Sequence, residues 1–219
     1  FWVKYNDLAK ETIRTHVEAG DCELSFIAQV LSCLPDKATL VLSNSMIVRD
    51  AELAFQESRK DITVISNRGA NGIDGVISTA IGAASSAEGP CLLLIGDIAA
   101  VHDISGLLAA GRLQSDLVII VIDNGGGAIF SFLPISQKID NRTFADLFTV
   151  PHGTSLNQIG EAAGLSTATI GSLPEIEQHL DQAFNNGGPW LFSFQTTVDE
   201  TVAAFSAIRS DFESSVFGR

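Results

Sequence analysis

The sequence predicts an α/β fold, a doubly wound parallel sheet with helices on both faces. Five short apolar runs recur along the chain, at residues 39–44, 62–66, 91–97, 117–123 and 190–195. The runs are continuous rather than alternating in polarity, which indicates strands buried on both faces of the sheet. Segments of helical length separate the runs, and this alternation is typical of parallel strands joined by right-handed helical crossovers.

Two helices are predicted ahead of the first strand. Residues 1–19 carry apolar side chains at helical spacing, and we expect 1–20 to form a leading helix within one domain that spans 1–219. Asp21 is the expected cap of a second helix. The core-facing residues of that helix are predicted to be Phe26, Ile27, Val30, Leu31 and Leu34.

Composition excludes several classes of function. The net charge of −13 argues against nucleic acid and anionic membrane surfaces as partners, because both attract Lys and Arg. No apolar run reaches the roughly 20 residues that a transmembrane helix needs. Cys22, Cys33 and Cys91 have no metal-binding spacing, so we expect them to be reduced thiols.

Polar and glycine-rich segments follow four of the predicted strands, at the edge where ligands bind in sheets of this kind. Gly96 and Asp97 end the third run, and Asn124 follows the fourth. A carboxylate, an amide oxygen and a backbone carbonyl near Gly126 are suitable ligands for Mg²⁺, which fills its octahedron with phosphate oxygens and water. Gly-Asp and Asn-Gly are also ordinary turn formers, so their place at two consecutive strand ends is what predicts the site.

Four segments resemble the 2-succinyl-5-enolpyruvyl-6-hydroxy-3-cyclohexene-1-carboxylate synthase family of thiamine-diphosphate enzymes. They are SNSMIVRD, SNRGANGIDGVISTAIG, IGDIAAVHD and DNGGGAIFSFLP, in the order of that family's C-terminal, pyrophosphate-binding domain. The resemblance covers roughly residues 22–200. It implies the thiamine-diphosphate-binding fold, with thiamine diphosphate and Mg²⁺ as cofactors. It also implies a transferase that decarboxylates 2-oxoglutarate and adds the resulting carbanion to isochorismate, in menaquinone or phylloquinone biosynthesis.

The same resemblance implies roles for individual residues. Those expected to bind the cofactor are Gly96, Asp97, Ile98, Asn124, Gly126, Ala128, Ile129 and Phe130, with Asp97, Asn124 and Gly126 holding the metal. Those expected to bind substrates are Ser45, Arg49, Asn67, Arg68, Phe130 and Leu133. Arg49 matches the family arginine that meets the isochorismate carboxylate, and a planar guanidinium suits such a contact. The plainer alternatives are solvated surface charges for Arg49 and Arg68, and core packing for the apolar residues.

The chain departs from the family pattern at several positions. Ile98 stands where the metal motif usually has Gly, and Ala99, Gly125 and Ala128 stand where the family commonly has Ser, Asn and Gln. These changes remove polar groups near the cofactor and put fine substrate contacts in question. His152 is expected to order a loop.

The family's catalytic glutamate, which activates the cofactor, comes from an N-terminal pyrimidine domain, usually of a partner subunit. No segment here resembles that domain. We therefore expect no catalytic residue in this chain, an inactive isolated domain and a homo-oligomer, in the bacterial cytoplasm or in a plastid. Two alternatives remain: another thiamine-diphosphate decarboxylase or carboligase, and a non-catalytic remnant domain used for interaction.

Overall fold

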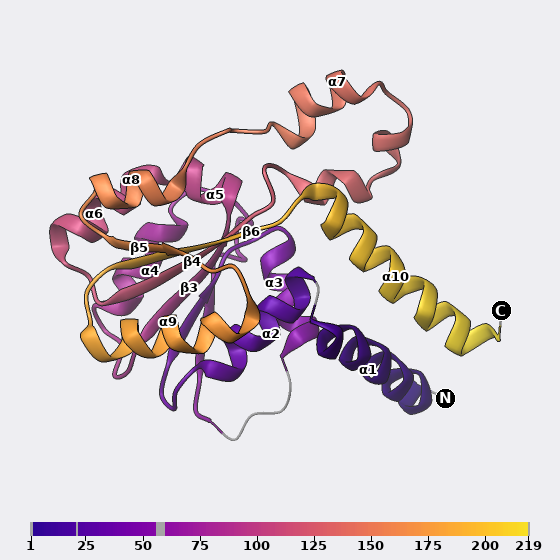
Figure 1. The fold of residues 1–219 in the computed structure, drawn as a ribbon, viewed down its shortest axis with the longest axis horizontal. Helices are drawn as coiled ribbons and strands as arrows, with labels where there is room; N and C mark the ends of the chain where they lie inside the picture. Colours follow the sequence, from indigo (N-terminus) through magenta and orange to yellow (C-terminus); the bar gives the residue numbers. More distant parts are fainter. Residues whose placement is uncertain (1, 21, 56–59, 219) are drawn as a thin grey trace.

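Six parallel strands form one sheet at the centre of the molecule. The computed structural model describes residues 2–20, 22–55 and 60–218, so the predicted cap Asp21 lies outside the described residues. The strand order is β2-β1-β3-β4-β6-β5. Figure 1 labels β3, β4, β5 and β6 of this sheet. The strands are β1 (Thr39–Leu42), β2 (Thr63–Ser66), β3 (Cys91–Gly96), β4 (Leu117–Asp123), β5 (Ser166–Thr169) and β6 (Trp190–Gln195).

Helices cover both faces of this sheet, each over its own hydrophobic core. One face packs on α2 (Glu23–Cys33), α3 (Met46–Ala54) and α9 (Leu173–Asn186). The other packs on α4 (Val76–Ala84), α5 (Asp97–His102), α6 (Ile104–Leu113) and α8 (Leu156–Ala162). Leu92 and Leu94 of β3 enter the first core and Leu93 and Ile95 the second, because successive strand residues point to opposite faces. The predicted doubly wound parallel fold is therefore confirmed.

The two edge strands differ from the sequence prediction. Residues 62–66 were expected to be buried on both faces, but Val64 of β2 is 52% exposed. Within the described part of the chain its strand pairs with β1 alone, so one side of the strand has no neighbouring strand. The other edge strand, β5, was not predicted because its sequence, STAT, contains no apolar run. Both errors arise at the edges of the sheet, where a strand has a neighbour on one side only and apolar sequence and burial on both faces no longer go together.

Two long helices extend from the sheet. These are α1 (Trp2–Ala19), close to the predicted helix, and α10 (Val198–Phe217), which lie side by side (Figure 1). His16 Nε2 lies 2.8 Å from Asp211 Oδ2 and links the two helices. Among the described residues, no helix is both long and apolar enough to cross a bilayer.

Between β4 and α8 the chain leaves the sheet and forms a small lobe, residues 128–149. The lobe contains η1 (Ala128–Phe132), η2 (Pro134–Gln137), α7 (Asn141–Phe144) and a π-helical turn, η3 (Ala145–Thr149). Phe148 stacks on Phe144 and meets Phe130 edge to face, so the lobe has its own aromatic contacts. At its base the Gly127 backbone N–H donates to the Thr149 carbonyl at 2.7 Å. The chain therefore returns to the sheet close to where it left.

Candidate functional site

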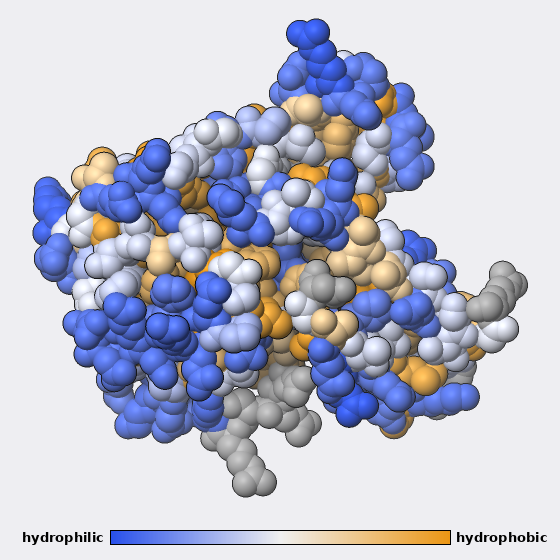
Figure 2. All heavy atoms as spheres, viewed as in Figure 1, coloured by the Kyte–Doolittle hydropathy of each residue, from blue (hydrophilic) through white to orange (hydrophobic). Residues whose placement is uncertain are grey.

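A cavity of about 400 Å³ lies at the carboxyl ends of β1, β3 and β4. The chain passes from β1 to β2 on one side and then to β3 on the other, so the strand order reverses here. Loops that follow such strands diverge and leave a crevice for a ligand. On the face shown in Figure 2, hydrophobic side chains gather between the sheet and the lobe, and hydrophilic residues cover most of the outer surface.

The structure brings most of the predicted site residues to this cavity. The lining includes Gly96, Asp97, Ile98, Asn124, Gly126, Ala128, Ile129, Phe130, Ser45, Arg49 and Arg68. Asn67 and Leu133 are not among the lining residues. Asn67 donates a hydrogen bond to Thr79 Oγ1 at 3.1 Å, and Leu133 is 47% exposed.

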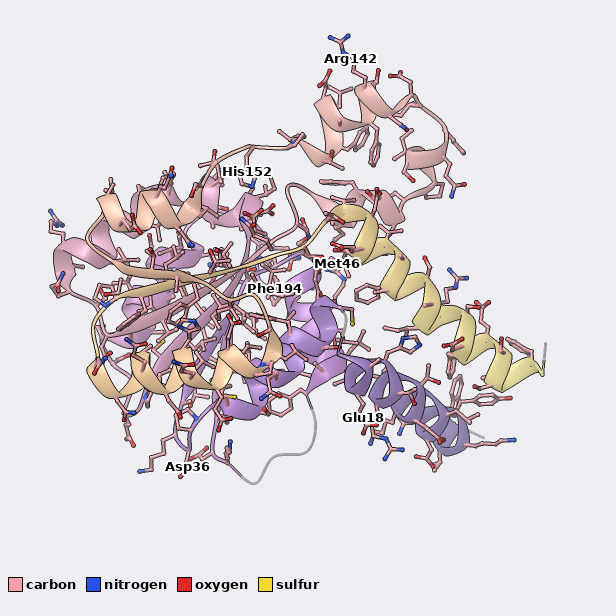
Figure 3. All side chains as sticks on the ribbon, viewed as in Figure 1. Glu18, Asp36, Met46, Arg142, His152 and Phe194 are labelled. Carbon is pink, nitrogen blue, oxygen red and sulfur yellow. The ribbon has the colours of Figure 1, made fainter. Side chains whose placement is uncertain are left out.

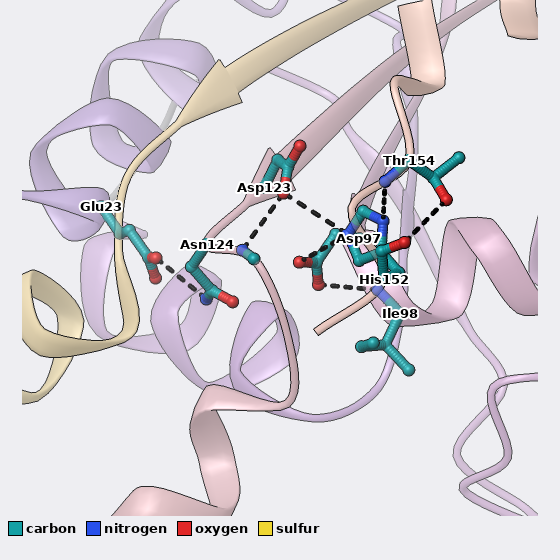
Figure 4. Close-up of polar contacts among 8 residues, drawn as sticks. Glu23, Asp97, Ile98, Asp123, Asn124, His152 and Thr154 are labelled. Atoms are coloured by element: carbon teal, nitrogen blue, oxygen red, sulfur yellow. Dashed lines mark hydrogen bonds and ion pairs between the residues drawn. The ribbon is translucent and has the colours of Figure 1, made fainter. Parts of the chain in front are cut away.

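Asp97 is buried at the first position of α5, directly after β3. Its Oδ1 accepts a hydrogen bond from the Ile98 backbone N–H at 2.6 Å, and its Oδ2 lies 3.3 Å from His152 Nε2 (Figure 4). Burial raises the pKa of the Asp97 carboxyl to about 6, against the effect of the Ile98 hydrogen bond, and the nearby charge of Asp123 adds to the rise. A negative charge in a buried place costs free energy unless a positive charge compensates it. The Asp97 carboxylate is therefore suited to bind a cation.

His152 joins the site from the end of the lobe. Figure 3 places it above the carboxyl end of the sheet, and its Nε2 also lies 3.6 Å from Asp123 Oδ1. The Thr154 backbone N–H donates to His152 Nδ1 at 3.1 Å, so Nδ1 is the acceptor and Nε2 carries the proton. Polar atoms of Asp97, Asp123 and His152 lie within 4.8 Å of one another. Because its Nε2 carries a proton, His152 acts as a donor to the Asp97 carboxylate rather than as a metal ligand.

The residues after β4 offer oxygen atoms to the same cavity. Asn124 donates from Nδ2 to Glu23 Oε1 at 3.1 Å, whereas its Oδ1 is buried and has no hydrogen-bond partner among the described residues. The Gly126 carbonyl accepts from the Ala128 N–H at 3.0 Å and keeps a second lone pair. A Cβ on Gly126 would lie 2.5 Å from the Thr149 carbonyl oxygen, so this backbone path needs glycine. An amide oxygen without a partner and a buried carboxylate, both on residues that line one cavity, fit Mg²⁺ and the diphosphate it would carry.

Two arginines supply positive charge to the cavity. Arg49 donates to the carbonyl of Ser45, the residue just before α3, and Arg68 donates to Asn44 Oδ1 at 3.1 Å. The same Asn44 donates from Nδ2 to the carbonyls of Asn67, at 3.2 Å, and Gly72, at 2.6 Å. Asn44 is buried, so these hydrogen bonds are shielded from water. The one side chain both anchors the loop after β2 and orients Arg68.

Sequence reasoning missed three polar residues of the site: Glu23, Asp123 and His152. Asp123 directly precedes Asn124 and could have been found from that position alone. Glu23 looks like an ordinary acidic residue in the first turn of a helix. His152 was expected only to order a loop, and no local signal connects it with Asp97.

Comparisons with known proteins identify the family of this chain. Residues 48–194 match the family model described as "Thiamine pyrophosphate enzyme, C-terminal TPP binding domain", where TPP is another name for thiamine diphosphate. The chain is 38% identical over 203 residues to the 2-succinyl-5-enolpyruvyl-6-hydroxy-3-cyclohexene-1-carboxylate synthase of Bacillus cytotoxicus, and 37% identical over 202 residues to that of Geobacillus thermodenitrificans. Each match covers 92% of this chain and 34% of the relative, so the chain spans about a third of the length of these curated relatives.

Solved structures show the same fold. Benzoylformate decarboxylase from Polynucleobacter necessarius superimposes with a TM-score of 0.69 at 17% identity, over 80% of this chain and 33% of the other. The thiamine diphosphate-dependent 4-hydroxybenzoylformate decarboxylase of Rhodococcus jostii gives a TM-score of 0.68 at 24% identity, over 83% and 34%. The fold, the site and the family match lead to one conclusion: this chain belongs to the thiamine pyrophosphate enzyme family, as its C-terminal cofactor-binding domain.

Proposed function

We propose that the chain is the cofactor-holding domain of a carboligase that decarboxylates 2-oxoglutarate and adds the resulting carbanion to isochorismate, in menaquinone or phylloquinone biosynthesis. The supporting observation is that Asp97 and Asn124 line one cavity together with Arg49 and Arg68. The names of the relatives support the same reaction, and their bacterial sources favour a bacterial protein over a plastid one.

The residues of the chain have distinct tasks in this proposal. Oxygen atoms of Asp97, Asn124 and Gly126 would hold Mg²⁺ and, through it, the diphosphate. When bound, thiamine diphosphate supplies the electron sink that makes loss of CO₂ from a 2-oxo acid feasible. Ile129 and Phe130 form an apolar wall of the cavity, which would keep water from the reacting carbon.

Arg49 and Arg68 are assigned to the substrate carboxylates. Both proposed substrates are dicarboxylates, and a chain of net charge −13 repels anions unless positive charge is placed locally. A guanidinium makes two parallel hydrogen bonds to one carboxylate, which gives both attraction and orientation. Simple 2-oxo monoacids would not need two such groups.

The proposal includes a partner. The catalytic glutamate that activates the cofactor is expected on a pyrimidine domain of the same or a second subunit, within a homo-oligomer. The chain alone should therefore bind cofactor weakly and turn over no 2-oxoglutarate. Turnover by the purified 219-residue chain would contradict this division of labour.

The decisive experiment measures thiamine diphosphate binding by calorimetry, with and without Mg²⁺, in the assembly that contains both domains. Asp97→Ala should abolish Mg²⁺-dependent binding. Asp116→Ala removes an exposed carboxylate just before β4, outside the cavity, and should leave it unchanged. Unchanged affinity in the Asp97 variant would overturn the metal assignment. Turnover of other 2-oxo acids but not of 2-oxoglutarate with isochorismate would overturn the substrate assignment.

A further inference from the structure

We infer that Glu23 is a positioning residue that orients the Asn124 amide so that its oxygen faces the cavity. The inference rests on the proposed function, in which Asn124 is a metal ligand. Glu23 Oε1 accepts a hydrogen bond from Asn124 Nδ2 at 3.1 Å, across 101 residues of sequence. Both side chains line the cavity, and Glu23 is 4% exposed. Figure 4 shows the pair beside Asp97, Asp123 and His152.

The contact determines which end of the amide is free. A carboxylate oxygen accepts hydrogen bonds, so the Asn124 NH₂ group must turn toward Glu23. Rotating the amide by half a turn would bring two acceptor oxygens together in a buried place. The Asn124 Oδ1 is consequently directed away from Glu23, and it is the atom left without a partner among the described residues. A cation needs that oxygen and is repelled by the NH₂ group.

Glu23 is in turn held in place by Thr201. The Thr201 hydroxyl lies 2.6 Å from the same Oε1, closer than the 3.0 Å to the Thr197 carbonyl behind it. Thr201 is buried near the start of α10, 178 residues away from Glu23. Three segments, α2, α10 and the loop after β4, thus meet at one oxygen atom. Outer partners of this kind commonly change metal affinity 10- to 100-fold when removed.

The test replaces Glu23 by residues of similar length with different hydrogen-bonding capacity. Glu23→Met cannot accept from Asn124, whereas the carbonyl of Glu23→Gln can. We expect the affinity for Mn²⁺, measured by electron paramagnetic resonance with thiamine diphosphate present, to fall about 10- to 100-fold in Glu23→Met and less in Glu23→Gln. Thr201→Val should give a smaller loss. Thermal melts identify variants that are folded.

A matched control tests the loss of a carboxylate away from the site. Glu18→Gln makes on α1 the same replacement as Glu23→Gln. Figure 3 places Glu18 away from Met46 of the cavity lining, and this variant should bind Mn²⁺ as the wild type does. A second readout needs no metal: the Asn124 side-chain NH₂ signal in ¹⁵N spectra should be protected from solvent exchange, and lose this protection in Glu23→Met. A resonance that stays protected would overturn the inference.

The outcomes distinguish the two proposals. Equal Mn²⁺ affinity in the wild type and in folded Glu23→Met would overturn the role of Glu23 and leave the proposed function standing. Failure of the wild-type assembly to bind Mn²⁺ with thiamine diphosphate would overturn the proposed function, and the positioning role with it.

Discussion

His152 Nε2 lies 3.3 Å from Asp97 Oδ2, although 55 residues separate them in the sequence. The lobe makes this contact possible, because the Gly127–Thr149 hydrogen bond returns the chain to the sheet just before His152. Both side chains are almost fully buried. Solvent therefore screens their interaction little, and each restricts the rotation of the other.

His152 should support cation binding through Asp97. We expect His152→Ala to lower the affinity for Mg²⁺ and thiamine diphosphate by about 10- to 100-fold, because the Asp97 carboxylate loses the donor that orients it. Calorimetry on the assembly containing both domains measures this. His102→Ala, an exposed histidine at the end of α5, is the control. If the two variants bind equally well, His152 only orders its loop.

Arg49 should govern the use of anionic substrates rather than the fold. Loss of a charge-assisted hydrogen bond costs about 1.5–3 kcal/mol, so Arg49→Ala should raise the isochorismate KM by about ten- to a hundredfold. Arg49→Lys should restore part of the loss, because an ammonium group cannot form the bidentate contact. Steady-state kinetics with each substrate varied in turn, in the full-length protein, are the measurement.

The control for this prediction is Arg112→Ala, an exposed arginine in the last turn of α6. Thermal melts should be unchanged in all of these variants, since Arg49 is exposed. An unaltered isochorismate KM in Arg49→Ala, or an unfolded protein, would show that the arginine is solvated or structural.

Asn44 should stabilise the fold by holding the loop after β2. Its side chain satisfies two loop carbonyls and the Arg68 guanidinium, so Asn44→Ala should lower the free energy of unfolding by about 1–3 kcal/mol. Urea titration measures this loss. Asn185→Ala, on the exposed side of α9, is expected to have little effect. If Asn44→Ala is as stable as this control, the loop after β2 is held by other contacts.

Asp50 should make the protein less stable as pH rises. It is fully buried, and its two carboxyl oxygens have no hydrogen-bond partner within the described part of the chain. Burial raises its pKa from 3.8 to about 8; Glu23 adds to the rise and Arg49 opposes it. Between these two values the folded chain holds a proton that the unfolded chain has released. The contribution of Asp50 to the free energy of unfolding therefore falls from about pH 4 to pH 8.

Asp50→Asn removes this titration, so its stability relative to the wild type should increase as pH rises. Urea titrations at pH 5, 7 and 9 give the difference at each pH. Asp7→Asn, at an exposed position of α1, should keep the wild-type dependence. A constant difference between wild type and Asp50→Asn would mean that Asp50 is ionised throughout.

The fold could be predicted wherever burial on both faces imposes a sequence pattern. Strands β1, β3 and β4 are continuous apolar runs because residues on each side enter a core. The edge strand β5 meets fewer such demands and its sequence shows no strand pattern. β5 is held in the sheet by backbone hydrogen bonds to β6, and the polarity of its side chains does not predict these bonds.

The candidate site divides in the same way. By itself the sequence determined the groups at the strand ends, such as Asp97 and Asn124. Each of these residues lies directly next to the strand that positions it, so the strand pattern also locates the residue. Only the tertiary structure decided their partners. Glu23 reaches Asn124 across 101 residues, and Thr201 reaches Glu23 across 178. Such contacts depend on how α2, α10 and the loop after β4 pack, and packing joins residues whose spacing in the sequence follows no local period.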